Sequence, residues 1–86
     1  MTHHTSRRFW DCYNTLPAEV RRLADQNHSL LEANPSHPSL QFKKVDRFWS
    51  VRVGLHYRAL GVQDRDDVVW FWIGHHAEYD RLISQR

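Results

Sequence analysis

The chain contains very little cysteine and no long apolar segment. Cys12 is the single cysteine among 86 residues, so no disulfide can form within the chain. No apolar run approaches the roughly 18 residues of a membrane-spanning helix, and the first residues lack the apolar core of a secretion signal. The sequence therefore predicts a cytoplasmic protein with no membrane partner and no disulfide framework.

A strong net charge is also missing, because 12 basic residues face 10 acidic ones and leave a formal charge of +2. A net charge this small says little about a nucleic-acid partner. The basic residues are unevenly distributed, however. Residues 43–58 hold one acid, Asp46, beside a group of cations: Lys43, Lys44, Arg47, Arg52 and Arg58. The middle of the chain is therefore locally basic.

The length and the apolar patterns indicate one small domain, residues 1–86. Aromatic residues make up 13% of the chain, with four Trp, and supply bulky core material for so short a protein. Ser6 predicts the N-cap of a two-turn helix, and apolar residues at helical spacing predict a second helix over residues 17–33. A third helix is expected over residues 75–84. Residues 1–5 are expected to form a mobile lead or a short edge strand.

Strand-like apolar runs follow the second helix and alternate with short turn-like stretches. The expected strands are residues 40–45, 48–53, 56–62 and 68–73, with the spacing of an antiparallel meander. The last run is apolar on both faces, which predicts a central strand whose tryptophans belong to the core. The predicted fold class is α+β, with two N-terminal helices on a four-stranded, mainly antiparallel sheet and a short C-terminal helix. One face of this sheet would carry helices, and the other would be free as a concave, basic surface.

Two arginines interrupt the apolar strand sequence and indicate an anion site. Alternate side chains of a strand point to opposite faces, so Arg52 and Arg58 share a face if their strands pair through a turn at residues 54–55. Two guanidinium groups side by side suit phosphate oxygens. A single arginine is more readily explained by a position at the rim or by an ion pair with an acid. The pair together favours a function.

Seven histidines raise the question of a metal site. His75 and His76 are adjacent, and adjacent residues of a helix point about 100° apart, which disfavours a shared ion. The chain also lacks Cys-x-x-Cys and His-x-x-x-His spacings. The sequence therefore predicts no metal ligand and no cofactor. His37 is expected to hydrogen-bond within a turn, and His56 is a secondary candidate on the predicted face of Arg58.

A family resemblance is carried by several segments in order: Leu16-Pro17, Asn34-Pro35 with Leu40 and Lys43-Lys44, Trp49-Ser50-Val51-Arg52, Tyr57-Arg58-Ala59-Leu60, and Ile73-Gly74-His75-His76-Ala77-Glu78-Tyr79. Each segment alone is weak evidence for a family, whereas the order and spacing of the segments together are specific for one. Through them nearly the whole chain resembles the RelE/ParE superfamily of type II toxins, in particular the RelE, YoeB and HigB-like ribonucleases. The resemblance implies a RelE-like fold.

The resemblance also implies a toxin that cleaves messenger RNA, in particular ribosome-bound message, and so inhibits translation. Its implied partners are a cognate antitoxin, which allows a toxin–antitoxin heterotetramer, and the message with its ribosome. Position by position, the resemblance makes Arg58 a contact of the scissile phosphate and Arg52 a second phosphate contact. It assigns RNA binding or proton transfer to the lysine pair Lys43-Lys44. It brings His76 and Tyr79 close to the C-terminal catalytic positions of the family.

The implied reaction needs no metal ion, because RNA supplies its own nucleophile in the 2'-hydroxyl. It needs a base, an acid and cations to stabilise the five-coordinate phosphorus. His75 or His76 is the candidate acid, and the lysine pair or a histidine is the candidate base. Arg47 and His56 complete the expected RNA contacts. Two other functions stay open: a ParE-like inhibitor of DNA gyrase, and an inactive fold that only binds an antitoxin.

Overall fold

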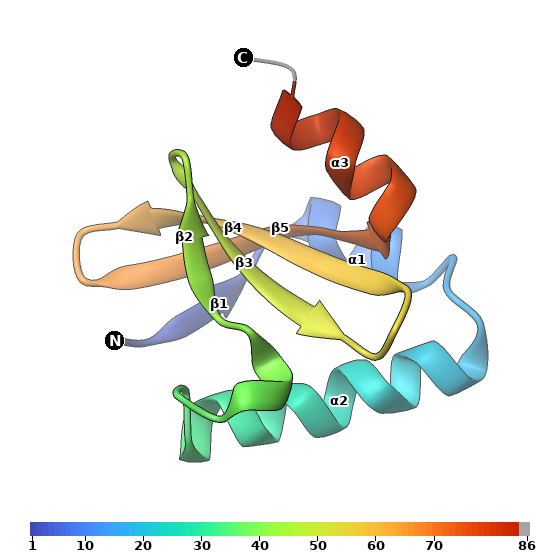
Figure 1. Ribbon diagram of the computed structural model, residues 1–86, viewed down its shortest axis with the longest axis horizontal. Coiled ribbons are helices and arrows are strands. Elements are labelled where there is room, and N and C mark those ends of the chain that lie inside the picture. Colours follow the sequence, from blue (N-terminus) through green and yellow to red (C-terminus); the bar gives the residue numbers. More distant parts are fainter. Residues whose placement is uncertain (85–86) are drawn as a thin grey trace.

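The computed structural model describes residues 1–84, which form a five-stranded sheet and three α-helices (Figure 1). The sheet order is β1-β5-β4-β3-β2, in which β1 pairs with β5 in parallel and all other pairs are antiparallel. In chain order the elements are β1 (His3–Thr5), α1 (Arg7–Tyr13), α2 (Ala18–Ala33), the 3-10 helix η1 (Pro38–Leu40), β2 (Lys43–Val45), β3 (Phe48–Val53), β4 (Tyr57–Asp64), β5 (Asp67–His75) and α3 (His76–Ser84). In this described part of the chain, every helix is too short or too polar to cross a membrane.

The two N-terminal helices begin and end close to the predicted positions. The Phe9 N–H donates a hydrogen bond of 3.3 Å to the Ser6 hydroxyl, which caps α1 as the sequence indicates. α2 starts directly after Pro17 and ends before Asn34, whose N–H closes the last turn. The apolar side of α2 lies against the sheet along the lower side of the molecule in Figure 1. Both helix predictions are confirmed.

The predicted meander is confirmed, but its first strand is shorter than expected. Residues 38–40 form the η1 turn, in which the His37 ring accepts a hydrogen bond of 3.2 Å from the Ser39 N–H, as expected for His37. Gln41 then adopts a left-handed conformation with φ of 45°, which is incompatible with an extended strand. β2 therefore begins at Lys43 and not at Leu40.

The N-terminal segment forms the short edge strand that the sequence left open, so the sheet has five strands and not the four of the predicted meander. The Val68 N–H donates to the Thr2 carbonyl and the Ser6 N–H donates to the Trp70 carbonyl, both at 3.0 Å. These bonds satisfy polar groups on the edge of β5, which the meander alone would leave unpaired. β5 thereby lies between β1 and β4, in the interior position predicted for it.

Hydrogen bonds that involve side chains also attach the N-terminal segment to β5. The Trp70 indole Nε1–H donates to His3 Nδ1 at 3.1 Å, and the Thr2 N–H donates to the Asp67 carboxylate at 3.1 Å. Burial lowers the pKa of His3, and the neighbouring His28 lowers it further. The hydrogen bond from His4 and the bond from the Thr2 N–H hold the pKa of Asp67 below its ordinary value.

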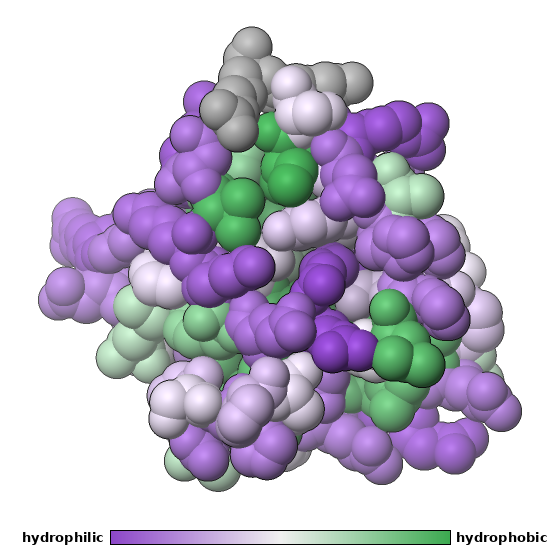
Figure 2. Space-filling view, viewed as in Figure 1, coloured by the Kyte–Doolittle hydropathy of each residue, from purple (hydrophilic) through white to green (hydrophobic). Residues whose placement is uncertain are grey.

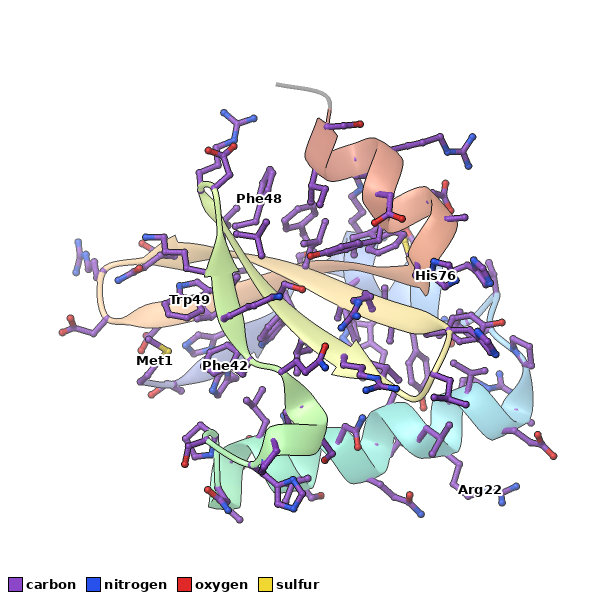
Figure 3. All side chains as sticks on the ribbon, in the orientation of Figure 1. Met1, Arg22, Phe42, Phe48, Trp49 and His76 are labelled. Atoms are coloured by element: carbon purple, nitrogen blue, oxygen red, sulfur yellow. The ribbon has the colours of Figure 1, made fainter. Side chains whose placement is uncertain are left out.

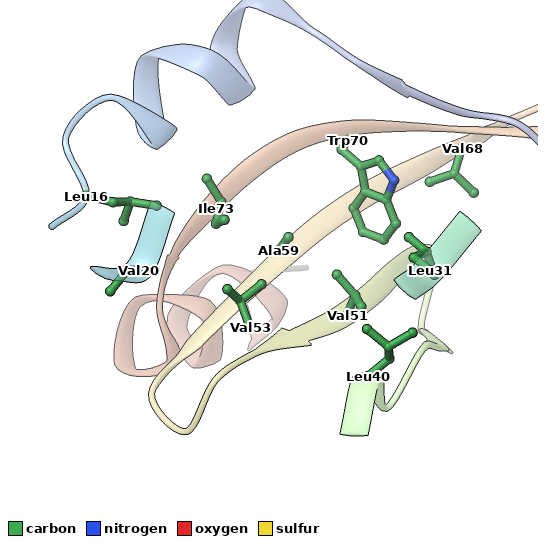
Figure 4. Close-up of a cluster of buried hydrophobic side chains, with 10 residues drawn as sticks. All are labelled: Leu16, Val20, Leu31, Leu40, Val51, Val53, Ala59, Val68, Trp70 and Ile73. Carbon is green, nitrogen blue, oxygen red and sulfur yellow. The ribbon is translucent and has the colours of Figure 1, made fainter. Parts of the chain in front are cut away.

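Both faces of the sheet carry an apolar core. The larger core lies on the side of α2 and consists of Leu16, Val20, Leu31, Leu40, Val51, Val53, Ala59, Val68, Trp70 and Ile73 (Figure 4). The smaller core, under α3, consists of Leu60, Trp72 and Tyr79. The register between β4 and β5 shifts at Leu60/Gly61, which lets Trp70 and Trp72 enter different cores although they are two positions apart and would share a face of a regular strand. Both tryptophans are core residues, as predicted.

The second face of the sheet is not free, contrary to the prediction of an open basic surface. α3 lies across it, above the sheet in Figure 1, and buries Tyr79 to 7% exposure against Leu60 and Trp72. The apolar side of α3 and the apolar residues of this sheet face exclude water from each other by packing together. What stays accessible on this face is the part beside α3, near β2 and the start of β4.

Candidate functional site

Arg52 and Arg58 are direct partners in the antiparallel ladder between β3 and β4. Directly opposite residues of such a pair point to the same face, so the shared face expected from strand alternation is present. Arg52 donates from Nε to the Gly54 carbonyl at 2.9 Å, and Arg58 donates from Nη1 to Gln41 Oε1 at 3.1 Å. Both acceptors are neutral. The ion pairs found within residues 1–84 join His4 of β1 to Asp67 of β5 and His28 to Glu32 within α2, so the structure gives neither arginine a carboxylate partner.

A cleft of about 470 Å³ opens beside Arg58, between the sheet and α3. Its lining comes from β2, the β3–β4 turn, β4 and α3: Lys43, Val45, Leu55, Arg58, His76, Tyr79, Asp80 and Ile83. In Figure 2 hydrophilic groups form a band across this face, with apolar groups above and below it. The cleft therefore joins candidate residues that lie far apart in the sequence.

The ring of Tyr79, on α3, contacts the Arg58 side chain. The Arg58 guanidinium carbon lies 5.7 Å from the centre of the Tyr79 ring, within the range of a cation–π contact. Because Tyr79 is only 7% exposed, its ring is packed in the core and the accessible part of the contact belongs to Arg58. In this structure Tyr79 therefore helps to position Arg58, and the catalytic role that the resemblance implies for Tyr79 stays a prediction.

The lysine pair is divided between the two faces of the sheet. Lys43 lines the cleft and pairs with Ser50 in the ladder, whereas Lys44 pairs with Trp49. Lys44 reaches Gln63 Oε1 at 3.4 Å and lies over the Trp49 ring at 5.9 Å. Neighbouring residues of a strand point to opposite faces, so the structure does not bring Lys44 together with the arginines.

Three further sequence candidates surround the cleft without lining it. Arg47 lies in the β2–β3 turn, where its guanidinium carbon is 5.2 Å from the centre of the Phe48 ring. Arg52 is next to Arg58 in the ladder. His56 closes the β3–β4 turn, just before β4 begins. These residues extend the basic surface on either side of the cleft.

His56, His75 and His76 form a cluster at the end of the sheet where α3 begins. His75 is the last residue of β5 and His76 the first of α3, so the two do not lie on one helix as the sequence prediction assumed. Nitrogen atoms of the three rings all lie within 4.8 Å of one another. The Ala77 N–H donates to His75 Nδ1 at 3.1 Å and so helps to start α3. Figure 3 shows His76 at the base of α3.

Gln41 is a site residue that the sequence did not indicate. It holds the Arg58 guanidinium through its side-chain oxygen, from a backbone position with φ of 45°. The contact joins the η1–β2 linker to β4 across 17 positions of sequence. No local pattern predicts such a contact, because it depends on how the linker crosses the sheet.

A second cavity, of about 530 Å³, lies between α1, α2 and the opposite face of the sheet. It is larger than the cleft, but the described residues that line it include neither arginine nor lysine. Most of its accessible lining is apolar and continues the larger core. For a phosphate-bearing ligand the smaller, cationic cleft is therefore the better candidate.

The class of the protein is shown by comparison with known families. The family model of the ParE-like toxin domain matches residues 18–81, and the chain belongs to this family. The resemblance to the RelE/ParE superfamily inferred from the sequence is thereby confirmed. No functionally curated protein matches the chain in sequence.

Solved structures of toxins share the fold at low sequence identity. The RelB-RelE antitoxin-toxin complex from Methanococcus jannaschii contains a chain that is 18% identical, with a TM-score of 0.69 over 91% of this chain and 96% of that one. YafQ from E. coli is 13% identical, with a TM-score of 0.68 over 90% and 94%. A chain of the RelBE2 toxin-antitoxin complex from Mycobacterium tuberculosis is 19% identical, with a TM-score of 0.64 over 86% and 95%. These likenesses establish the RelE-like fold.

Proposed function

We propose that the chain is the toxin of a type II toxin–antitoxin system and that it cleaves messenger RNA in the cleft beside α3. The observation that carries the proposal is the pair Arg52 and Arg58, directly opposed on one sheet face, with no carboxylate partner for either among residues 1–84. Like charges on directly opposite residues of a ladder repel each other, and an anion bound by both arginines would relieve this repulsion. A phosphodiester is the anion that fits both their geometry and the neighbouring Lys43 and His76.

In the proposed reaction the 2'-oxygen attacks the adjacent phosphorus, a new P–O2' bond forms and the P–O5' bond breaks. The proton of the 2'-hydroxyl passes to a base, and the leaving 5'-oxygen takes a proton from an acid. Arg58, held by Gln41 and Tyr79, stabilises the extra negative charge on the phosphorus oxygens, and Arg52 assists.

Which candidates line the cleft narrows the choice of the residues that act as acid and base. His76 lines the cleft and is the proposed acid, with His75 beside it as the alternative. Lys43 is the lysine that lines the cleft, so it replaces Lys44 as the proposed base. Lys43 comes from β2 and His76 from α3, and in-line displacement would require the base and the acid on opposite sides of the phosphate.

A cognate antitoxin and the translating ribosome are the proposed partners. Two of the similar structures named above are toxin–antitoxin complexes, which supports an antitoxin for this chain. An antitoxin segment with acidic side chains would complement the basic residues around the cleft. A heterotetramer of two toxins and two antitoxins in the cytoplasm is the proposed resting form.

The proposal is tested by mapping RNA 5' ends after brief induction of the toxin in cells. New ends that recur at one position of the codon would establish cleavage of message on the ribosome. The same mapping with the Arg58→Ala variant should show no new ends. Unchanged message after induction of the parent protein, at a level that stops growth, would refute the ribonuclease proposal.

A ParE-like inhibitor of DNA gyrase is the second candidate function. It is favoured by the ParE-like character of the matching family model and by the position of Lys44 on the far face, which reduces the set of groups for proton transfer. Such a protein would leave message intact and produce broken DNA. Measuring DNA breaks in the same induced cells therefore separates the two candidates.

A further inference from the structure

Three imidazole rings from separate parts of the chain converge at the end of the sheet. Nitrogen atoms of His56, His75 and His76 lie within 4.8 Å of one another, and the ring centres of His75 and His76 are 4.5 Å apart. The His56 ring centre lies 6.2 Å from that of His75 and 6.1 Å from that of His76. We propose that these three histidines together bind one divalent metal ion that prefers imidazole ligands, namely Zn²⁺, Cu²⁺ or Ni²⁺.

The backbone holds the three residues in place before any ion binds. The His76 N–H donates to the His56 carbonyl at 2.8 Å, which ties the start of α3 to the β3–β4 turn. His75 is the ladder partner of Tyr57, the residue after His56. Sheet pairing thus holds His75, and the backbone hydrogen bond joins His76 to His56, so metal binding requires side-chain rotation but no folding of a loop.

The side-chain movement needed is small. Nitrogen ligands at the usual zinc distance of about 2.0–2.1 Å lie roughly 3.4 Å apart around a tetrahedral ion. Closing the cluster from 4.8 Å therefore requires the rings to approach by little more than an ångström. His56 and His75 are exposed and have room to rotate. Metal binding would also replace the Ala77 N–H as the partner of the His75 ring.

The chemistry of the ligands selects the kind of ion. Three neutral imidazole nitrogens suit zinc, copper and nickel, whereas calcium and magnesium prefer carboxylate and carbonyl oxygens. The cluster contains no carboxylate, so it is a nitrogen-only site. Three protein ligands leave one position of a tetrahedral ion open to water or to an anion. That open position would lie near the cleft, since His76 lines both.

One premise of the sequence argument against a metal ion does not hold in the structure. It treated His75 and His76 as neighbours on one helix, whose side chains diverge by about 100°. The chain changes from strand to helix between these residues, and their rings are stacked at an interplanar angle of 29°. The third ligand, His56, comes from a turn that is distant in the sequence and adjacent in the sheet.

The test is calorimetric titration of the purified full chain with ZnCl₂, without RNA, so that it does not depend on cleavage. The parent chain should bind one Zn²⁺, and His56→Gln should bind it at least 10- to 100-fold more weakly, because even the loss of an outer partner of a metal ligand typically has an effect of about this size. His28→Gln, which removes an exposed histidine of α2, is the matched control and should bind like the parent.

Thermal unfolding of each metal-free variant shows whether it is folded, and His75→Gln provides a second ligand variant if His56→Gln is not. Absence of zinc binding by the parent chain would overturn the proposal. Equal binding by His56→Gln and the parent, or a loss in His28→Gln as large as that in His56→Gln, would also overturn it. A titration with MgCl₂ should show no comparable binding, and equal affinity for Mg²⁺ would contradict the nitrogen-only site.

Discussion

Replacing Arg58 by alanine should abolish most of the proposed RNA cleavage while the protein stays folded. Removing one donor that stabilises charge in a transition state typically raises the barrier by about 3–4 kcal/mol, which corresponds to a loss of roughly 10²–10³ in rate. Arg58 is the arginine that lines the cleft, with Lys43 and His76 beside it. Arg58→Lys should lie between the parent and alanine, because an ammonium keeps the charge but lacks the planar fork.

The loss of stability expected from Arg58→Ala is small. The variant loses a hydrogen bond to the Gln41 side chain, a contribution of about 0.5–1.5 kcal/mol, and the contact with Tyr79, about 0.5–1 kcal/mol. It also removes the like charge directly opposite Arg52, a relief of about 0.2–1 kcal/mol. The net loss of about 0–2 kcal/mol is small beside the 5–15 kcal/mol typical of a folded domain.

The assay compares cleavage of ribosome-bound message by the purified parent and variant, with thermal unfolding and antitoxin binding measured on the same samples. Arg22→Ala is the matched control, since Arg22 is an exposed arginine that projects from α2 away from the sheet (Figure 3). It should cleave like the parent. A folded Arg58→Ala protein that cleaves as fast as the parent would refute the role of the arginine pair.

The remaining predictions concern stability, pH and metal. Gly61→Ala should lower the free energy of unfolding by about 1–3 kcal/mol, measured with urea, because an added Cβ would lie 2.6 Å from Val68 Cγ1; an unchanged midpoint would contradict this packing. Stability should fall as the pH drops below 6.5, since the lowered pKa of His3 means that the unfolded chain binds the proton first. His3→Asn should flatten this pH dependence in urea unfolding, and a slope equal to that of the parent would contradict it. Saturating Zn²⁺ should slow RNA cleavage and EDTA should restore it, because a histidine bound to metal cannot transfer a proton; unaffected cleavage by zinc-loaded toxin would exclude such a histidine from catalysis.

The helices and the meander were predictable because their causes are local. The Ser6 cap, Pro17 before α2 and Asn34 at its end act within a few residues of themselves. Strand alternation likewise assigned Arg52 and Arg58 to one face, and the ladder confirms it. The same alternation separates Lys43 from Lys44, although the resemblance had assigned the two lysines to one region.

The parts that could not be predicted depend on contacts between distant segments. β1 becomes a strand because the edge of β5 offers it hydrogen bonds, and nothing in residues 1–5 alone requires this. The support of Arg58 by Gln41 and Tyr79 joins three elements that only the folded sheet brings together. The number of strands and the neighbours of the arginine were therefore beyond any local pattern.

The sequence by itself determined the α+β class, the order of the elements after residue 5, and the shared face of the two arginines, because periodicity and capping act over a few residues. Tertiary structure alone decided that α3 covers the second face of the sheet, that one lysine of the pair lines the cleft, and that three histidines meet. These outcomes depend on where the chain turns from strand to helix and on which surfaces must be buried, and both are properties of the whole fold.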